Sequence, residues 1–153
     1  MTNQEIHSKT RLFGRQRRLA ALLGVGLLCP LGLAAVLHPN GCGYGTHQQL
    51  GLPPCTFEVL FGRPCPSCGS TTAFACLVRG HVGAALRANV GGTVFAGLCV
   101  VAGPWLLASA ARGRWIAWTP SGPWVAVIAA AIAGVMVMDW VIRLWCGGRG
   151  MGG

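Results

Sequence analysis

Two cysteines stand three positions apart in the segment Arg-Pro-Cys-Pro-Ser-Cys-Gly-Ser-Thr-Thr-Ala-Phe, residues 63–74, and a third, Cys55, lies shortly before them. Cysteine thiolates bind soft or borderline metal ions, exchange electrons as a dithiol, or close a disulfide. The sequence therefore predicts a sulfur site made of Cys55, Cys65 and Cys68. Three hypotheses for this site follow: a metal centre, a redox dithiol or a structural disulfide.

The metal hypothesis rests on the Cys-Pro-x-Cys-Gly turn, which resembles one half of a zinc ribbon, where two such turns complete a tetrahedral site. Because only one turn of this kind is present, further ligands must come from elsewhere in the chain. Cys55 would be the third ligand. The candidates for additional ligands are Cys42, His47, Cys76 and His81. Such a set suits a structural zinc ion or a soft cuprous ion.

The other two hypotheses use the same sulfurs differently. A disulfide from Cys55 to Cys65 or Cys68 would staple an extracytoplasmic loop and stabilise it by ~2 to 4 kcal/mol. A Cys65–Cys68 dithiol would instead serve a membrane thiol–disulfide oxidoreductase, and Cys-Pro-Ser-Cys before a helix is similar to glutaredoxin-type active sites. Neither a thioredoxin-type βαβ pattern nor a four-span bundle can be read here. The sequence favours a non-catalytic role, with the oxidoreductase as the alternative.

The residues around the two cysteines predict how the turn is built. Pro66 fixes the backbone between the sulfurs, Gly69 permits a tight turn, and a hydroxyl residue such as Thr71 can cap the helix that follows. Apolar residues recur at helical spacing over residues 72–79, which predicts a short amphipathic helix. A thiol at a helix N-terminus has its pKa lowered, which favours metal ligation and thiol exchange equally.

The composition places the whole chain in a membrane. Of the 153 residues, 53% are hydrophobic and 10% are charged, whereas soluble proteins average about 25% charged residues. Three segments are long and apolar enough to cross about 30 Å of hydrocarbon as helices: residues 19–37, 90–111 and 124–142. The predicted fold is an all-α integral membrane protein with three transmembrane helices, and its main surroundings are the lipid bilayer.

The remaining segments connect these spans. Residues 1–18 form a basic tail, residues 112–123 a short connection, and residues 143–153 a glycine-rich tail. The loop at residues 38–89 holds the cysteines. It should contain short, half-inserted helices at residues 53–62, 72–79 and 82–89, the last running straight into the second span.

The cations predict the orientation. Seven of the 12 lysines and arginines lie in the N-terminal tail or in the 112–123 connection, and five lie in the cysteine loop or the C-terminal tail. By the positive-inside rule the N-terminus is cytoplasmic and the cysteine loop external. The basic residues are not gathered with aromatic residues on a polar domain, so nucleic acid is not an expected partner. An accessory role implies a membrane-protein partner or a second copy of the chain.

An ordered set of short motifs resembles a known family. These are Cys55, then Leu-Phe-Gly-Arg-Pro-Cys-Pro-Ser-Cys-Gly-Ser-Thr-Thr-Ala-Phe at 60–74, Arg-Gly-His at 79–81 and Ala-Ala-Leu-Arg-Ala-Asn at 84–89. Together they are similar to the domain of unknown function 2752 family, small bacterial membrane proteins with a Cys-Pro-x-Cys-Gly-x-Thr-Arg-Ala core. The lead-in Gly-Tyr-Gly-Thr-His-Gln-Gln-Leu-Gly-Leu-Pro-Pro-Cys-Thr-Phe at 43–57 is similar to planctomycete-type members.

Two positions depart from the family pattern. Thr72 stands where the family usually has arginine, which removes a cation next to the cysteines, and His81 stands where an aspartate is common. Roles of that arginine and aspartate are therefore not carried over. The family has no established activity, so the resemblance implies the type of protein and leaves its function to be argued from the site.

Overall fold

The computed structural model describes residues 11–39 and 45–147, which are helical throughout apart from connections and one isolated backbone bridge. Three long helices, each long and apolar enough to cross a membrane, are α2 (Gly14–Val36), α6 (Val90–Arg112) and α7 (Gly122–Gly147). Four short helices lie between α2 and α6: η1 (Thr46–Leu50), α3 (Thr56–Phe61), α4 (Ser70–Val78) and α5 (Val82–Ala88). The predicted all-α class with three apolar spans is confirmed.

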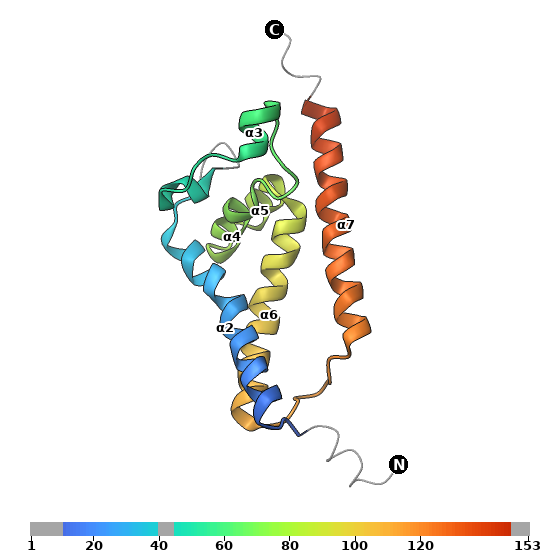
Figure 1. The fold of residues 1–153 in the computed structure, drawn as a ribbon. Coiled ribbons are helices and arrows are strands. Elements are labelled where there is room, and N and C mark those ends of the chain that lie inside the picture. The colour runs from blue at the N-terminus through green and yellow to red at the C-terminus, as the bar shows by residue number, and fades with distance from the viewer. Residues whose placement is uncertain (1–10, 40–44, 148–153) are drawn as a thin grey trace.

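The long helices alternate in direction (Figure 1). The start of α2 and the end of α6 meet at one end of the molecule, where the Leu12 amide donates to the Gly113 carbonyl over 2.9 Å. The C-terminal half of α7 reaches the opposite end, beside α3 and the cysteine-containing connection. The N-terminal segment and the α6–α7 connection therefore share one end of the bundle, and the cysteines lie toward the other.

Close packing of α2 against α6 depends on small residues. A Cβ added at Gly24 would lie 2.9 Å from the Leu107 side chain, and one added at Gly103 would lie 2.7 Å from Leu28. In lipid, where burial supplies little drive for association, such close backbone approach lets van der Waals contacts hold helices together. The short helix α4 completes this core, whose buried members are Leu31, Ala34, Phe74, Ala75, Ala96 and Cys99.

Two arginines satisfy carbonyl groups at the C-terminal ends of α2 and α6. The Arg17 guanidinium donates to the carbonyls of Ala110 and Ala111 at 2.7 and 3.2 Å. Arg79 donates to Ala34 and Ala35, both at 3.1 Å. The last carbonyls of a helix lack intrahelical partners, so these cations stabilise both ends and tie them to other segments.

Helix α7 packs more loosely than the other two spans. It contacts α6 at Gly91, where Met136 of α7 lies so close that no side chain would fit at the glycine position. Most of its apolar side chains are exposed in the isolated chain, including Val137 and Trp145. In a bilayer, such side chains suit contact with acyl chains.

The structure corrects two expectations about the short helices. Helix α5 does not run into α6, because Asn89 between them is extended (φ −167°, ψ 114°) and its side chain accepts a hydrogen bond from the Gly92 amide. The start of α4 has no side-chain cap; Gly69 occupies the cap position in the left-handed region, with φ 91°. The predicted capping by Thr71 or its hydroxyl neighbours is therefore wrong, and backbone freedom at glycine forms this start instead.

Candidate metal centre

Three cysteine sulfurs converge where the connection between α2 and α6 folds over the ends of the bundle. The Sγ atoms of Cys55, Cys65 and Cys68 all lie within 4.8 Å of one another, and those of Cys65 and Cys68 are 3.3 Å apart. Around a tetrahedral zinc ion with Zn–S bonds of about 2.3 Å, sulfurs are about 3.8 Å apart. This sulfur cluster therefore needs only small side-chain shifts to ligate one ion.

Local backbone structure places each sulfur. Cys55 occupies the position directly before α3. Cys65 and Cys68 flank a tight turn in which the Cys68 amide donates to the Cys65 carbonyl over 3.0 Å. We call residues 64–69 the cysteine turn; Pro66 lies inside it and Gly69 ends it, as the sequence predicts. The cluster thus joins the starts of two short helices that are separate in sequence.

Asn89 holds the cysteine turn against α6. Its side chain is fully buried, and its Nδ2 donates to the carbonyls of Pro66 and Cys68 at 3.0 and 3.1 Å. Its Oδ1 accepts from the Gly92 amide over 2.7 Å. One amide side chain therefore caps α6 and fixes the backbone that carries two of the sulfurs.

Helix α7 holds the same turn from the other side. The Trp140 indole donates to the Pro64 carbonyl over 2.8 Å, and its ring packs edge-on against Phe57 of α3. Arg143 donates to the Cys68 carbonyl over 3.3 Å and pairs with Asp139 at 3.0 Å. Arg143 also brings a cation to the cysteine turn. The arginine of the family pattern is absent near this turn, because Thr72 stands at its position.

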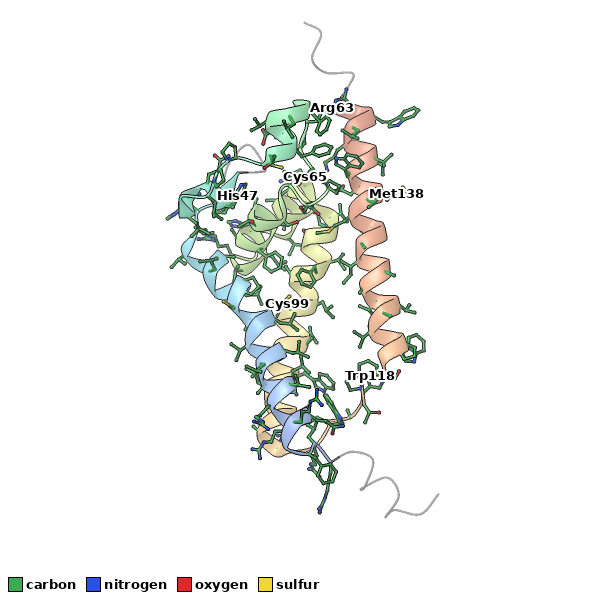
Figure 2. The ribbon with its side chains drawn as sticks, viewed as in Figure 1. His47, Arg63, Cys65, Cys99, Trp118 and Met138 are labelled. Atoms are coloured by element: carbon green, nitrogen blue, oxygen red, sulfur yellow. The ribbon has the colours of Figure 1, made fainter. Side chains whose placement is uncertain are left out.

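A cavity of about 260 Å³ opens beside the sulfur cluster. Its lining comprises Gly45, His47, Cys55, Cys65, Ser67, Cys68, Gly69, Thr71 and Thr72. Behind this wall, the hydroxyls of Thr46 and Thr72 are hydrogen-bonded at 2.7 Å in a buried position. His47 and Cys65 lie toward the same end of the molecule, whereas Cys99 lies far along the bundle (Figure 2). His47 therefore lines the same cavity as the three sulfurs, but its ring nitrogens are not among the ligand atoms that lie within 4.8 Å of one another.

The other predicted ligands lie elsewhere. Cys76 is buried in a second hydrophobic cluster with Ala73, Ala85 and Ala88, and His81 is exposed directly before α5. Neither lines the cavity. Cys42 falls outside the described residues. Of the four additional candidates, the structure brings only His47 to the wall of the cavity.

The Cys55 and Cys68 thiols differ in acidity. The backbone amide of Glu58 at the start of α3 is the main cause that lowers the pKa of Cys55 to about 7, with help from the neighbouring thiols. Burial, followed by the Cys65 thiol, raises the pKa of Cys68 to about 12. In the metal-free protein at neutral pH, Cys55 is therefore partly thiolate while Cys68 keeps its proton. A metal ion would have to displace that proton on binding.

This difference predicts the pattern of alkylation in metal-free, reduced protein. Only the thiolate attacks iodoacetamide, so Cys55 should be modified at a rate that rises with pH and is half-maximal near pH 7. Cys68 should stay unmodified across the same range, since its pKa is raised to about 12. Peptide mass spectrometry after brief labelling reads both sites. Equal labelling of the two cysteines near neutral pH would contradict the assigned environments.

Sequence reasoning did not identify Asn89, Trp140 and Arg143 as parts of the site. Asn89 did carry a signal, since asparagine directly before an apolar run is typical of a helix N-cap. Its second role, as donor to the cysteine turn, has no local signature. Trp140 and Arg143 lie far along the chain from that turn, and only the packing of α7 brings them there.

The fold and site together define the class: a small three-span helical membrane protein with a sulfur cluster on the connection between its first two spans. Residues 55–103, from the first cysteine of the cluster into α6, match the family model described as protein of unknown function (DUF2752). The resemblance read from the sequence motifs is thereby confirmed, while the planctomycete type stays a prediction. Comparisons with curated proteins and with solved structures find no match.

Proposed function

We propose that this protein is a non-catalytic membrane module that binds one thiophilic metal ion, zinc(II) or copper(I), through Cys55, Cys65 and Cys68. The observation that carries the proposal is the convergence of the three Sγ atoms within 4.8 Å. Thiolates select these ions over hard cations such as magnesium or calcium. A three-sulfur set suits copper(I) by itself, whereas zinc would need a fourth ligand, and His47 on the cavity wall would have to move toward the sulfurs to supply it.

The surroundings of the sulfurs support a rigid binding site. Asn89, Trp140 and Arg143 hold three backbone carbonyls of the cysteine turn, those of Pro64, Pro66 and Cys68. Groups that orient metal ligands in this way contribute to affinity although they do not touch the ion. Three thiolates around a mono- or divalent ion also leave a net negative charge, which the nearby Arg143 guanidinium would partly offset.

We place the site on the external face of a bacterial inner membrane, with the N-terminus in the cytoplasm. The basic N-terminal segment and Arg112 and Arg114 share one end of the bundle, as the positive-inside rule asks of a cytoplasmic side. The sulfur cluster lies toward the other end. A module of this kind would act with a membrane-protein partner or as an oligomer, holding or passing on the ion.

The test is elemental analysis of the full-length protein, purified in detergent without chelator and without added reductant. We expect about one zinc or copper ion per chain, as for other closed thiolate sites. Thiol counting in denaturant gives a second readout: eight thiols per chain if all cysteines are reduced, and eight minus two if a disulfide is present. Metal-free protein with eight thiols would contradict the proposal.

One observation favours a second candidate, the thiol–disulfide oxidoreductase. The Cys65 and Cys68 sulfurs are in contact at 3.3 Å, and the pKa of the neighbouring Cys55 is lowered to about 7. The same experiment separates the two functions. A metal-free protein that shows six thiols, and regains eight reversibly at a defined dithiol potential, would indicate redox exchange. A bond that resists millimolar reductant would indicate a structural staple.

A further inference from the structure

A second cavity lies at the end of the bundle away from the sulfur cluster, and arginines dominate its lining. Its volume is about 490 Å³, and it is lined by Arg11, Leu12, Phe13, Arg17, Arg112, Gly113 and Arg114. Four of the lining residues come from the segment before α2 and its first turn, and three come from the end of α6 and the two residues after it. We call it the arginine cavity.

Backbone pairing builds this cavity. Residues 11 and 114 form an antiparallel bridge, and the Leu12 amide donates to the Gly113 carbonyl over 2.9 Å. The Leu12 side chain is buried, which anchors the pairing. Two segments about a hundred residues apart in sequence are thereby clipped together, and their arginines face a common space.

The charge of this cavity is not balanced by the described part of the chain. Arg17 is engaged with the carbonyls that end α6, whereas Arg11, Arg112 and Arg114 form no ion pair among the described residues. The two described carboxylates, Glu58 in α3 and Asp139 in α7, lie toward the sulfur end of the bundle. Three exposed guanidinium groups thus converge without a carboxylate.

Neighbouring aromatic residues place the cavity at the depth of lipid headgroups. Trp105 stacks on Trp115 at 5.5 Å between ring centroids and lies 6.0 Å from Trp118. Tryptophans of this kind gather at the membrane–water interface. Phe13, 70% exposed, lies at the rim of the cavity, where its apolar ring could contact the upper acyl region.

We propose that the arginine cavity binds the phosphate group of an anionic phospholipid. Guanidinium groups bind phosphate oxygens in a bidentate manner, and basic pockets between transmembrane helices suit anionic headgroups. The position at the ends of two spans favours a lipid over a soluble phosphate, because the acyl chains of the lipid would lie along α2 and α6. The simpler interpretation is that these arginines act only as topology signals. That role requires positive charge but neither a cavity nor a bidentate donor.

The test uses full-length protein delipidated in a neutral detergent, with bound lipid counted by native mass spectrometry and binding followed by tryptophan fluorescence. Phosphatidylglycerol, phosphatidylcholine and inorganic phosphate are titrated separately. We expect saturable binding of phosphatidylglycerol and at least about tenfold weaker binding of the other two. In the double variant Arg112→Gln, Arg114→Gln, affinity for phosphatidylglycerol should fall about 30-fold, the effect of two interfacial cations.

Two further variants make the result decisive. Arg63→Gln with Arg87→Gln removes the same charge from exposed positions between α2 and α6, and affinity should stay within about twofold of the parent. Arg112→Lys with Arg114→Lys keeps the charge, and therefore the topology signal, but removes the bidentate donors, so affinity should fall severalfold. Equal binding of both lipids, unchanged affinity in the glutamine or lysine variant, or preferential binding of inorganic phosphate would each overturn the proposal of a lipid site.

Discussion

Replacing Cys68 with alanine should remove the bound metal ion. A four-ligand zinc site in a small domain binds with about 10 to 16 kcal/mol, or about 3 kcal/mol per ligand, so the loss of one thiolate should weaken binding about 100-fold. Cys68 is the most buried of the three sulfurs, and alanine can replace neither its charge nor its reach. Elemental analysis after dialysis against a weak chelator should find no metal in Cys68→Ala.

Cys76→Ala is the matched control for this variant. Cys76 is also buried, lies on α4 directly after the cysteine turn, and packs in a hydrophobic cluster away from the cavity. Both substitutions delete one small buried sulfur and should lower the free energy of unfolding by a similar amount, about 1 to 2 kcal/mol. Only Cys68→Ala should lose the ion. Equal metal content in the two variants would show that the sulfur cluster is not the binding site.

Substituting Asn89 with aspartate should weaken both the fold and the metal site. The aspartate can still accept the Gly92 hydrogen bond that caps α6, but it cannot donate to the Pro66 and Cys68 carbonyls. It would also place a carboxylate against two carbonyl oxygens in a fully buried position. Losing two buried hydrogen bonds in this way costs about 2 to 4 kcal/mol in the free energy of unfolding. Loss of groups that orient metal ligands should lower metal affinity by about 10- to 100-fold.

Thr93→Val separates the effect on the site from the effect on stability. The Thr93 hydroxyl donates to the Asn89 backbone carbonyl over 2.8 Å, one turn along α6, and makes no hydrogen bond with the cysteine turn. Valine keeps its shape, so this variant should lose about 1 kcal/mol of stability and keep its metal affinity. Thermal unfolding in detergent and competitive metal titration measure the two quantities. If Asn89→Asp bound metal as tightly as Thr93→Val, Asn89 would have only a structural role.

The three spans were readable from the sequence because crossing a bilayer depends on length and apolarity, which are local properties. The helix limits were less certain. Helix α2 begins at Gly14, before the predicted start at Leu19, because a helix continues through its polar flank beyond the hydrocarbon. The junction of α5 and α6 was missed, since the break at Asn89 depends on hydrogen bonds to a distant turn as well as on its own N-cap preference.

The candidate site also has features that the sequence predicts and features that it does not. Cys65 and Cys68 come together because a proline and a glycine shape the turn around them, and this was visible in the residues themselves. The sequence also nominated Cys55 as the third sulfur, but it could not choose a further ligand among Cys42, His47, Cys76 and His81. That choice depends on which side of each short helix faces the turn. The packing of α4 against α5 buries Cys76 in an apolar cluster, and it does not line the cavity.

The amino-acid sequence by itself determined that this chain is a helical membrane protein, where its spans lie, and that two thiols occupy one turn before a helix. Each of these follows from short-range rules of hydrophobic length and turn chemistry. The tertiary structure alone decided that Cys55 closes the cluster, that Asn89 and α7 hold the cysteine turn, and that arginines near the start of α2 and the end of α6 share a cavity. These features are contacts between segments distant in sequence, and such contacts are fixed only when the helices pack.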